Sequence, residues 1–275
     1  MAFRPNKSFR SIIDDLGLST GLQLCLDAGD LASYPGSGQK WLDQAQRYDF
    51  FLGATSGAAA DDPTFNGVAG DLKDNTYWAL DGTQFFRYDT TNETWMQNLH
   101  KNGATYTFVG WVWFGTLVSV VCIAGTIGDS SFIFFHTGIQ FRTAASKVFN
   151  VLVENGTLGA ALNVSSAADI QENAWNFVAA SYNEATPLLT FLVNGEITTS
   201  ATAYASPDAG AASFTMEIGA GGNSYTPLPN TSRIGFIGMW NRALSAQELM
   251  NLYQYPGATF SSQGNVSRQK VMVGY

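Results

Sequence analysis

The chain has 275 residues, which is enough for one large domain with a substantial buried core. Its formal net charge is −8, so it lacks the excess of Lys and Arg that a nucleic-acid groove requires. Charged residues and aromatic residues each make up 13%, and 28 residues are glycine, a composition typical of an all-β domain with many tight turns.

The first predicted strand, 21–27, is followed by the sequence PGSGQK, which resembles the end of a phosphate-binding loop. A phosphate-binding loop needs Gly-Lys-Ser/Thr, so that backbone N–H groups surround the phosphates and a hydroxyl reaches magnesium. Here Gln39 separates the glycine from Lys40, and Trp41 occupies the hydroxyl position. We therefore interpret the stretch as a surface turn at Pro35-Gly36, with Trp41 returning toward the core.

No charged residue lies between Lys101 and Asp129, and this length could cross a bilayer. The segment is rich in Val, Thr, Trp and Phe, it is interrupted by glycines, and its aromatic residues lie in the middle instead of at the ends. These features favour two core strands, 105–114 and 117–124, joined near Gly115. We do not expect membrane insertion.

Two pairs of predicted strands carry hairpin signals, at Asn155-Gly156 and Asn194-Gly195. Asn and Gly adopt positive φ at low cost, as the tight turns of hairpins require. Alternating or apolar runs predict the remaining strands. Besides those already given, they are 76–81, 84–88, 131–136, 148–153, 157–164, 175–182, 188–194, 213–219 and 233–240.

Helical signals are few. A short helix is predicted over 92–103. Near the end of the chain, Ser245 and Glu248 have the spacing of a capping box, apolar side chains of the following turns share one face, and Pro256-Gly257 ends the pattern. Cys25 and Cys122 both lie in apolar runs, and we interpret them as small buried hydrophobic residues.

Several segments, in this order, resemble laminin-G-like, concanavalin A-like jelly-roll domains of bacteriophage structural proteins and bacterial surface proteins. They are GLQLCLDAGDLASYPGSGQKW, YWALDGTQFFRY, TYTFVGWVWF, NAWNFVAASYNEATPLLTFLVNG and RIGFIGMWNRALSAQELMNLY. The last segment is the most specific. One departure is DQAQRYDFF, where relatives usually have Asp-x-Ser-Gly-x-Gly after the tryptophan.

The resemblance implies an all-β fold, a two-sheet antiparallel β-sandwich of the concanavalin A-like jelly-roll type with one short C-terminal helix. We expect the sandwich over 18–255, an extended N-terminal arm over 1–17 and a C-terminal arm over 256–275. The N-terminus lacks the apolar core of a signal peptide, so nothing in the sequence indicates ordinary secretion.

The fold hosts glycosidases, lectins and structural modules, so function must come from a site. Retaining glycosidases need two carboxyl groups about 5 Å apart, and no Glu-x-Asp-x-Glu run exists here. Glu217 is alone on its strand, and we interpret Asp14-Asp15 and Asp61-Asp62 as solvated acids. His100 and His136 are far apart in the chain with no nearby Cys or His, and no Gly-x-Ser-x-Gly elbow is present. We expect no enzymatic activity.

Two sets of residues are candidates for binding. Tyrosines in predicted loops could stack on sugars. Acids near strand ends could supply oxygen ligands to calcium, the one candidate cofactor. Loop tyrosines without a ligand and acids that cap turns are common, and we favour those interpretations. The candidates are Tyr34, Tyr204 and Tyr225 for carbohydrate, and Asp27, Asp30 and Asp81 for calcium.

The sequence therefore predicts a non-enzymatic virion protein of a tailed phage or phage-like particle: a head decoration, head fibre or spike, or tail appendage. We expect it to be made in the host cytoplasm and to lie on the particle exterior. Its expected partners are other virion proteins, through the terminal arms, host-surface glycans and further copies of itself. The alternatives are a glycan-cleaving enzyme of the same fold and a bacterial surface carbohydrate-binding module.

Overall fold

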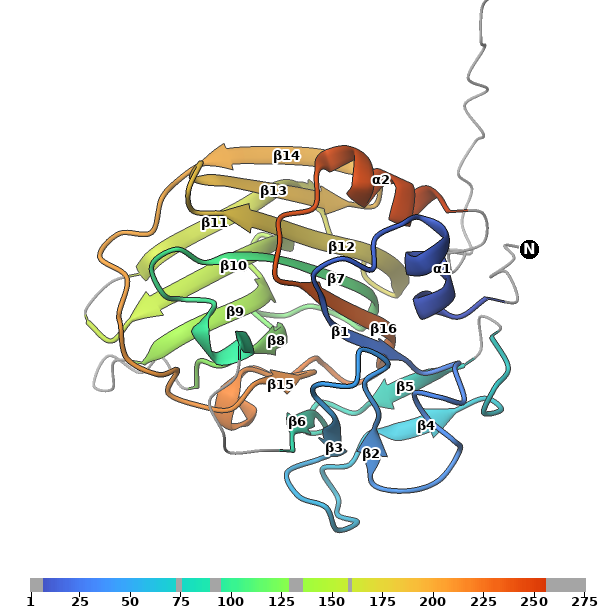
Figure 1. Cartoon of the computed structure of the whole chain (residues 1–275). Coiled ribbons are helices and arrows are strands. Elements are labelled where there is room, and N and C mark those ends of the chain that lie inside the picture. The colour runs from blue at the N-terminus through green and yellow to red at the C-terminus, as the bar shows by residue number, and fades with distance from the viewer. Residues whose placement is uncertain (1–6, 73–75, 90–94, 129–135, 158–159, 256–275) are drawn as a thin grey trace, which may run out of the picture.

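The computed structural model describes residues 7–72, 76–89, 95–128, 136–157 and 160–255. They form two eight-stranded sheets, A and B, stacked as the two layers of a sandwich (Figure 1). Every pair of strands in both sheets is antiparallel. The predicted fold class, an all-β antiparallel sandwich, is confirmed.

Sheet A has β14 at one edge and β4 at the other, and β1 pairs with β16 next to β5. In spatial order its strands are β14 (Glu196–Ala201), β13 (Leu188–Val193), β12 (Ala174–Asn183), β7 (Thr105–Phe114), β16 (Ser232–Trp240), β5 (Tyr77–Leu80) and β4 (Thr64–Asn66), with β1 (Leu22–Asp27) beside them.

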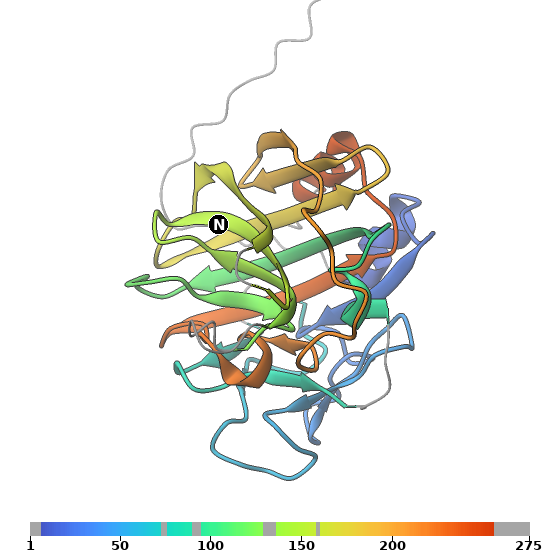
Figure 2. The same ribbon diagram turned by 90° about the vertical axis from the view of Figure 1, so that its left-hand side faces the viewer.

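Sheet B runs from β11 to β2. In spatial order its strands are β11 (Ala160–Asp169), β10 (Val148–Asn155), β9 (Thr137–Thr143), β8 (Cys122–Gly125), β15 (Glu217–Ile218), β6 (Phe86–Tyr88), β3 (Phe50–Leu52) and β2 (Lys40–Trp41). The view in Figure 2, turned by 90°, shows the two layers from the side. Two 3-10 turns, η1 (Trp95–Asn98) and η2 (Gly222–Ser224), complete the described elements together with the helices α1 (Phe9–Asp15) and α2 (Ala246–Gln254).

Most predicted strands are present. The uncharged segment forms β7 and β8, which belong to different sheets, so the chain crosses the core between them. No helix among the described residues is long and apolar enough to span a membrane. Both hairpins form, and Asn194 and Gly195 have φ values of 50° and 93°. The predicted strand 131–136 lies almost wholly outside the described residues, and the predicted ranges do not include β2, β3, β4, β9 or β14.

The core between the sheets is aromatic. Trp78 lies at its centre with no exposed surface, and its ring centroid is 4.6 Å from that of Tyr34, 5.9 Å from that of Trp41 and 5.2 Å from that of Phe86. Trp41 therefore returns to the core as predicted, while the turn after Tyr34 is exposed. Both cysteines are fully buried and unpaired, as predicted.

The outer face of sheet A is covered by both described α-helices, which lie next to each other in Figure 1. Helix α1 corrects the prediction that residues 1–17 form an extended arm. Ser8 caps it, and Phe9, Ile12 and Ile13 point from one side into the sheet because residues three and four apart share a face. The Phe9 ring stacks on that of Phe236, with centroids 4.0 Å apart.

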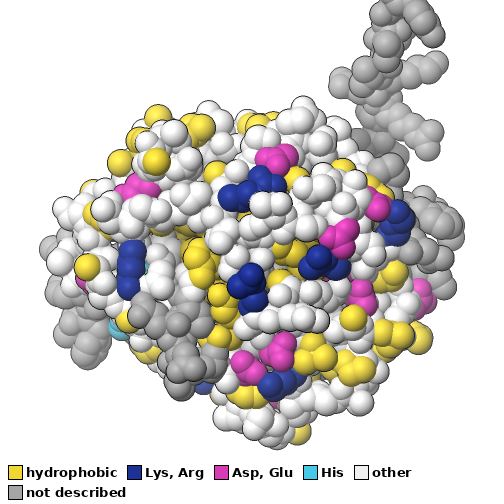
Figure 3. Space-filling view, viewed as in Figure 1, with side chains coloured by type: hydrophobic (Ala, Val, Ile, Leu, Met, Phe, Trp, Pro, Cys, Tyr) yellow, Lys and Arg dark blue, Asp and Glu magenta, His cyan; other side chains and the backbone are white. Residues whose placement is uncertain are grey.

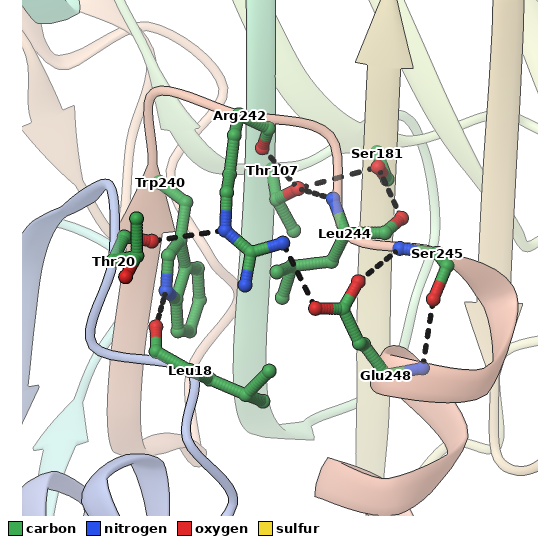
Figure 4. A network of polar contacts seen from close by, with 9 residues as sticks. All are labelled: Leu18, Thr20, Thr107, Ser181, Trp240, Arg242, Leu244, Ser245 and Glu248. Carbon is green, nitrogen blue, oxygen red and sulfur yellow. Dashed lines mark hydrogen bonds and ion pairs between the residues drawn. The ribbon is translucent and has the colours of Figure 1, made fainter.

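Helix α2 begins as predicted: the Ser245 hydroxyl accepts from the Glu248 N–H, and the Glu248 carboxylate accepts from the Ser245 N–H. Figure 4 shows how this cap is tied to the sheet. The Glu248 carboxylate also accepts from Arg242 at 2.9 Å, and the Thr107 hydroxyl accepts from the Leu244 N–H at 2.8 Å. The segment between β16 and α2 thus fixes the start of the helix to sheet A. The predicted helix over 92–103 is only the 3-10 turn η1 within the described residues.

Candidate functional site

The outer face of sheet B carries a line of side chains from seven strands. Alternate residues of a strand point to opposite faces, so while Phe141 of β9 and Val151 of β10 enter the core, the residues between them point outward. Strand register pairs Asn150 with Arg142 and Arg142 with Cys122, and separately pairs Glu217 with Arg87, Arg87 with Phe51 and Phe51 with Lys40; on β8 the residue opposite Glu217 is Gly125. We call these outward residues the outer row: Asn150, Arg142, Cys122, Glu217, Arg87, Phe51 and Lys40.

The centre of the outer row is a buried ion pair. Glu217 is 1% exposed, and one of its carboxylate oxygens accepts two hydrogen bonds from Arg87, at 2.6 and 2.9 Å. The other oxygen accepts from the backbone N–H of Ser224 at 2.7 Å. Burial raises the pKa of Glu217, and the hydrogen bonds and charge of Arg87 offset this only in part. The carboxylate is therefore held in one orientation.

Near one end of the outer row, Arg142 is hydrogen-bonded to neutral side chains, with the Glu154 carboxylate close enough to raise its pKa. Its Nε donates to Asn150 at 2.9 Å, and one terminal nitrogen lies 3.4 Å from Gln140 Oε1. Burial lowers the pKa of Arg142, although a guanidinium stays charged at neutral pH. Burial raises the pKa of the Cys122 thiol, so Cys122 is not a reactive thiolate. This end of the row presents a fixed cation among amides.

At the other end, Lys40 lies over the Phe51 ring, 5.4 Å from its centroid, and pairs with Asp89 at 2.5 Å. Asp49 is 3.9 Å from the same ammonium group. A shallow pocket of about 420 Å³ adjoins this end. It is lined by Ala32, Leu42, Asp43, Gln46, Arg47, Asp49 and Asp89.

The carboxylates of this face do not have the geometry of a glycosidase pair formed within the sheet. Glu154 on β10 also points outward, but β9 and β8 separate β10 from β15. Three strand spacings put Glu154 and Glu217 about 14 Å apart, whereas glycosidase carboxyl groups are about 5 to 9.5 Å apart. Asp61 lies near enough to raise the pKa of Glu217 slightly, and its own carboxylate accepts from the Ala54 N–H at 2.9 Å.

Two of the three predicted sugar-binding tyrosines are not exposed, so that part of the prediction is wrong. Tyr34 and Tyr204 are each 6% exposed. Tyr34 packs in the aromatic core, and Tyr204 stacks on Tyr182 with its hydroxyl donating to the Leu99 carbonyl at 2.9 Å. Each lies in a loop that returns into the sandwich. Tyr225 is half-buried and close enough to Arg142 to influence its pKa, so Tyr225 remains a candidate.

The three predicted calcium ligands cap backbone groups. Fully buried Asp27 accepts from the N–H groups of Phe9 and Gly29, which ties α1 to the end of β1. Asp30 accepts from the Ala32 N–H, and Asp81 from the Thr83 N–H and hydroxyl. No group of three or more His, Cys, Asp or Glu residues able to hold a metal was found among the described residues.

The sequence analysis did not single out Arg87, Arg142 or Lys40. The sequence does contain a pattern that could have indicated them. Each cation lies in a strand next to residues that point into the core, as Arg87 does between Phe86 and Tyr88 in β6. Such a cation must face away from the core. Which cations of different strands become neighbours depends on strand order, which no local pattern encodes.

The family model Laminin_G_3, described as Concanavalin A-like lectin/glucanases superfamily, matches residues 72–250. Among solved structures, Trypanosoma rangeli sialidase in complex with the inhibitor DANA is 13% identical with a TM-score of 0.54, and a mutant of this sialidase displaying trans-sialidase activity is 11% identical with a TM-score of 0.52. Each alignment covers 86% of this chain and 33% of the sialidase.

The chain thus spans about a third of the length of those sialidases, and at this identity the similarity concerns the fold alone. A comparison of the sequence with curated proteins found no match. The family match covers more than half of the chain and includes β5 to β16 and the capping box of α2. The chain belongs to the Laminin_G_3 family of the concanavalin A-like lectin/glucanases superfamily.

Proposed function

We propose that this chain is a non-catalytic glycan-binding protein that uses the outer face of sheet B. The observation that carries the proposal is the outer row, on the face that α1 and α2 do not cover: there buried Asn150 and Glu217 hold the partly exposed Arg142 and Arg87 in fixed positions. A catalytic carboxyl must exchange protons and approach a substrate. Glu217 instead has its oxygens committed to Arg87 and Ser224, which supports binding without turnover.

The chemistry of the outer row suits sugar hydroxyls. Arg presents several donors in a planar fork, so neighbouring hydroxyls can be bound in pairs. Arg142 has an orientation set by Asn150 and Gln140, which reduces the entropy lost on binding. Half-buried Tyr225, beside Arg142, supplies aromatic surface for a sugar ring.

A glycan array followed by calorimetry on the best binder tests this proposal. Arg142→Gln should reduce affinity at least about tenfold, the effect expected for loss of a charged hydrogen bond. The matched control is Arg10→Gln on α1, at the opposite face of the molecule, which should bind as the wild type does. Thermal melting checks that both variants are folded. Absence of any glycan binding, or equal binding by the two variants, contradicts the proposal.

For the biological setting we propose an exposed structural protein of a tailed phage or phage-like particle, attached to other virion proteins. The support is the order of sequence segments that resembles phage jelly-roll domains. Mass spectrometry of purified particles should detect the chain as a stoichiometric component. Absence from particles, combined with glycan binding, would instead favour a bacterial surface carbohydrate-binding module.

A glycan-cleaving enzyme is the second candidate, favoured by one observation: Asp61 lies near buried Glu217, whose pKa is raised. A raised pKa is a common property of a general acid. Reducing-sugar release from bacterial exopolysaccharides measures turnover directly. We expect none; turnover that Glu217→Gln abolishes, in a variant that still melts cooperatively, would establish the enzyme instead.

A further inference from the structure

The described sheets have five edge strands, and four of them are protected against pairing with another chain. Strands β2 and β4 have two and three residues, and short edges are poor templates. The outer side of β1 is occupied: the Cys25 N–H donates to Asp43 and its carbonyl accepts from the Gln44 N–H. Strand β11 has two register irregularities against β10, and its Ala161 carbonyl accepts from the Ala205 N–H.

Strand β14 has none of these protective features. It runs over six residues in unbroken register with β13, and its sequence EITTSA contains no Lys and no Pro. It forms the rim of sheet A in Figure 1, with nothing drawn beyond it on that side. Ile197 near the hairpin, 41% exposed, and Leu188 at the far end of β13 opposite Ala201, 42% exposed, are two of the five large hydrophobic residues that the described chain exposes. A regular six-residue edge whose one charge, Glu196, lies at its end is a template for a further strand.

The hairpin fixes which backbone groups are available. Val193 and Glu196 flank the two-residue Asn194-Gly195 turn and therefore form a hydrogen-bonded pair. Backbone N–H and C=O groups alternate in direction along a strand. Those of Glu196, Thr198 and Ser200 therefore point toward β13, and those of the intervening residues point outward, away from the sheet. The outward groups belong to Ile197, Thr199 and Ala201, and none of them is hydrogen-bonded to another described residue.

We propose that β14 pairs antiparallel with β14 of a second copy of this chain, joining the two A sheets across a two-fold axis at Thr199. Hydrogen-bonded pairs then form between Thr199 and its copy and, twice, between Ile197 and Ala201. This register uses all three outward residues of each strand.

The sequence of β14 is self-complementary in this arrangement, which is the reason for choosing a second copy as the occupant. Glu196, the charged residue of the strand, lies at one end, so antiparallel pairing keeps the two Glu196 side chains at opposite ends of the interface. The uncharged residues Ile197 and Thr199 meet at the centre. A two-fold axis also closes the assembly at a dimer, without an open fibre.

Sedimentation velocity over a concentration series tests the proposal. The wild type should form a dimer, and Thr199→Lys should weaken dimerisation at least about tenfold because two like charges meet on the axis. An equimolar mixture of Thr199→Lys and Thr199→Glu should regain the dimer. The matched control, Thr64→Lys on the opposite edge strand β4, should dimerise as the wild type does.

The register is tested by cysteine crosslinking under mild oxidation. Thr199→Cys should crosslink, since residues in a hydrogen-bonded pair have Cα atoms about 5.5 Å apart, within the disulfide range. Ile197→Cys should not, because its two copies lie four residues apart along the strands, about 14 Å. Cys25 and Cys122 are buried and do not compete. A monomeric wild type at all concentrations, or dimers unaffected by Thr199→Lys, would overturn the proposal.

Discussion

The outer faces of the two sheets are built in opposite ways. On sheet A, outward residues of the central strands are large and apolar, and α1 and α2 cover them. On sheet B, the corresponding positions hold the outer row, with an ion pair at its centre and no α-helix packed against it. In Figure 3, which views the molecule as in Figure 1, positive and negative side chains are interspersed and do not gather into one charged patch.

This difference shows two ways of completing the outer face of a sheet within one sandwich. Apolar surface on sheet A must be removed from water, and both ends of the described chain supply the helices that do so. Sheet B buries charge, which burial alone would disfavour, and compensates with hydrogen bonds in fixed directions. In the proposed function, these fixed directions are what a bound glycan would meet.

The largest expected effect is on the sheet A face. Phe9→Ala removes the ring that stacks on Phe236 and leaves a cavity under α1, so we expect the free energy of unfolding to fall by about 3–5 kcal/mol. Urea denaturation measures it. Ser11→Ala, at an exposed position of the same helix, is the control and should change stability little. If the two variants are equally stable, α1 does not close the sheet in solution.

The next largest effect is on the sheet B face. Arg87→Met leaves the Glu217 carboxylate buried without its cation, and because Arg87 is itself 30% exposed we expect a loss of only about 2–3 kcal/mol at pH 7. Without Arg87 the pKa of Glu217 rises further above its unfolded value. A group with a raised folded-state pKa loses stability as pH rises through that pKa, so the variant should be closer to the wild type at pH 4 than at pH 7.

Denaturation at the two pH values measures this difference, with exposed Arg47→Met as the control. A loss that is independent of pH would show that Arg87 acts through packing of its side chain and not through Glu217.

The smallest expected effect on stability comes from the N-terminal cap of α2, one of the two helices that cover sheet A. Ser245→Ala removes the hydroxyl that accepts from the Glu248 N–H and should cost about 1 kcal/mol. The shift in the urea midpoint measures it, and Gln247→Ala, on the first turn of the same helix, is the comparison. If Ser245→Ala lowers the free energy of unfolding more than Phe9→Ala does, then α2 stabilises the outer face of sheet A more than α1 does.

Local patterns predicted much of the fold. The apolar run of β7, the Asn194-Gly195 hairpin and the Ser245–Glu248 box each depend on residues close in sequence, and each formed as expected. Helix α1 had a comparable signal in Ser8, Phe9 and Ile12, but its short length and position before the first strand favoured an arm. Strands β2 to β4 were missed because two or three residues are too few for a period to be recognised.

The candidate site was less predictable. Tyr34 and Tyr204 were expected at the surface because they lie in loops, yet both loops fold back so that the rings enter the core. Tertiary packing, which the loop sequences do not encode, decided their burial. The acids Asp27, Asp30 and Asp81 cap backbone groups, the interpretation that turn chemistry had favoured.

By itself, then, the sequence determined the antiparallel sandwich, its hairpins, the capped last helix and the family, because these follow from periodicity, turn residues and motif order. Only the tertiary structure decided that Glu217 pairs with Arg87, 130 positions away in the chain, and that Arg142 lies in the same row. The physical reason is strand order: β15 lies between β6 and β8 in sheet B although it is far from both in sequence, so the outer row exists only once the sheet has formed.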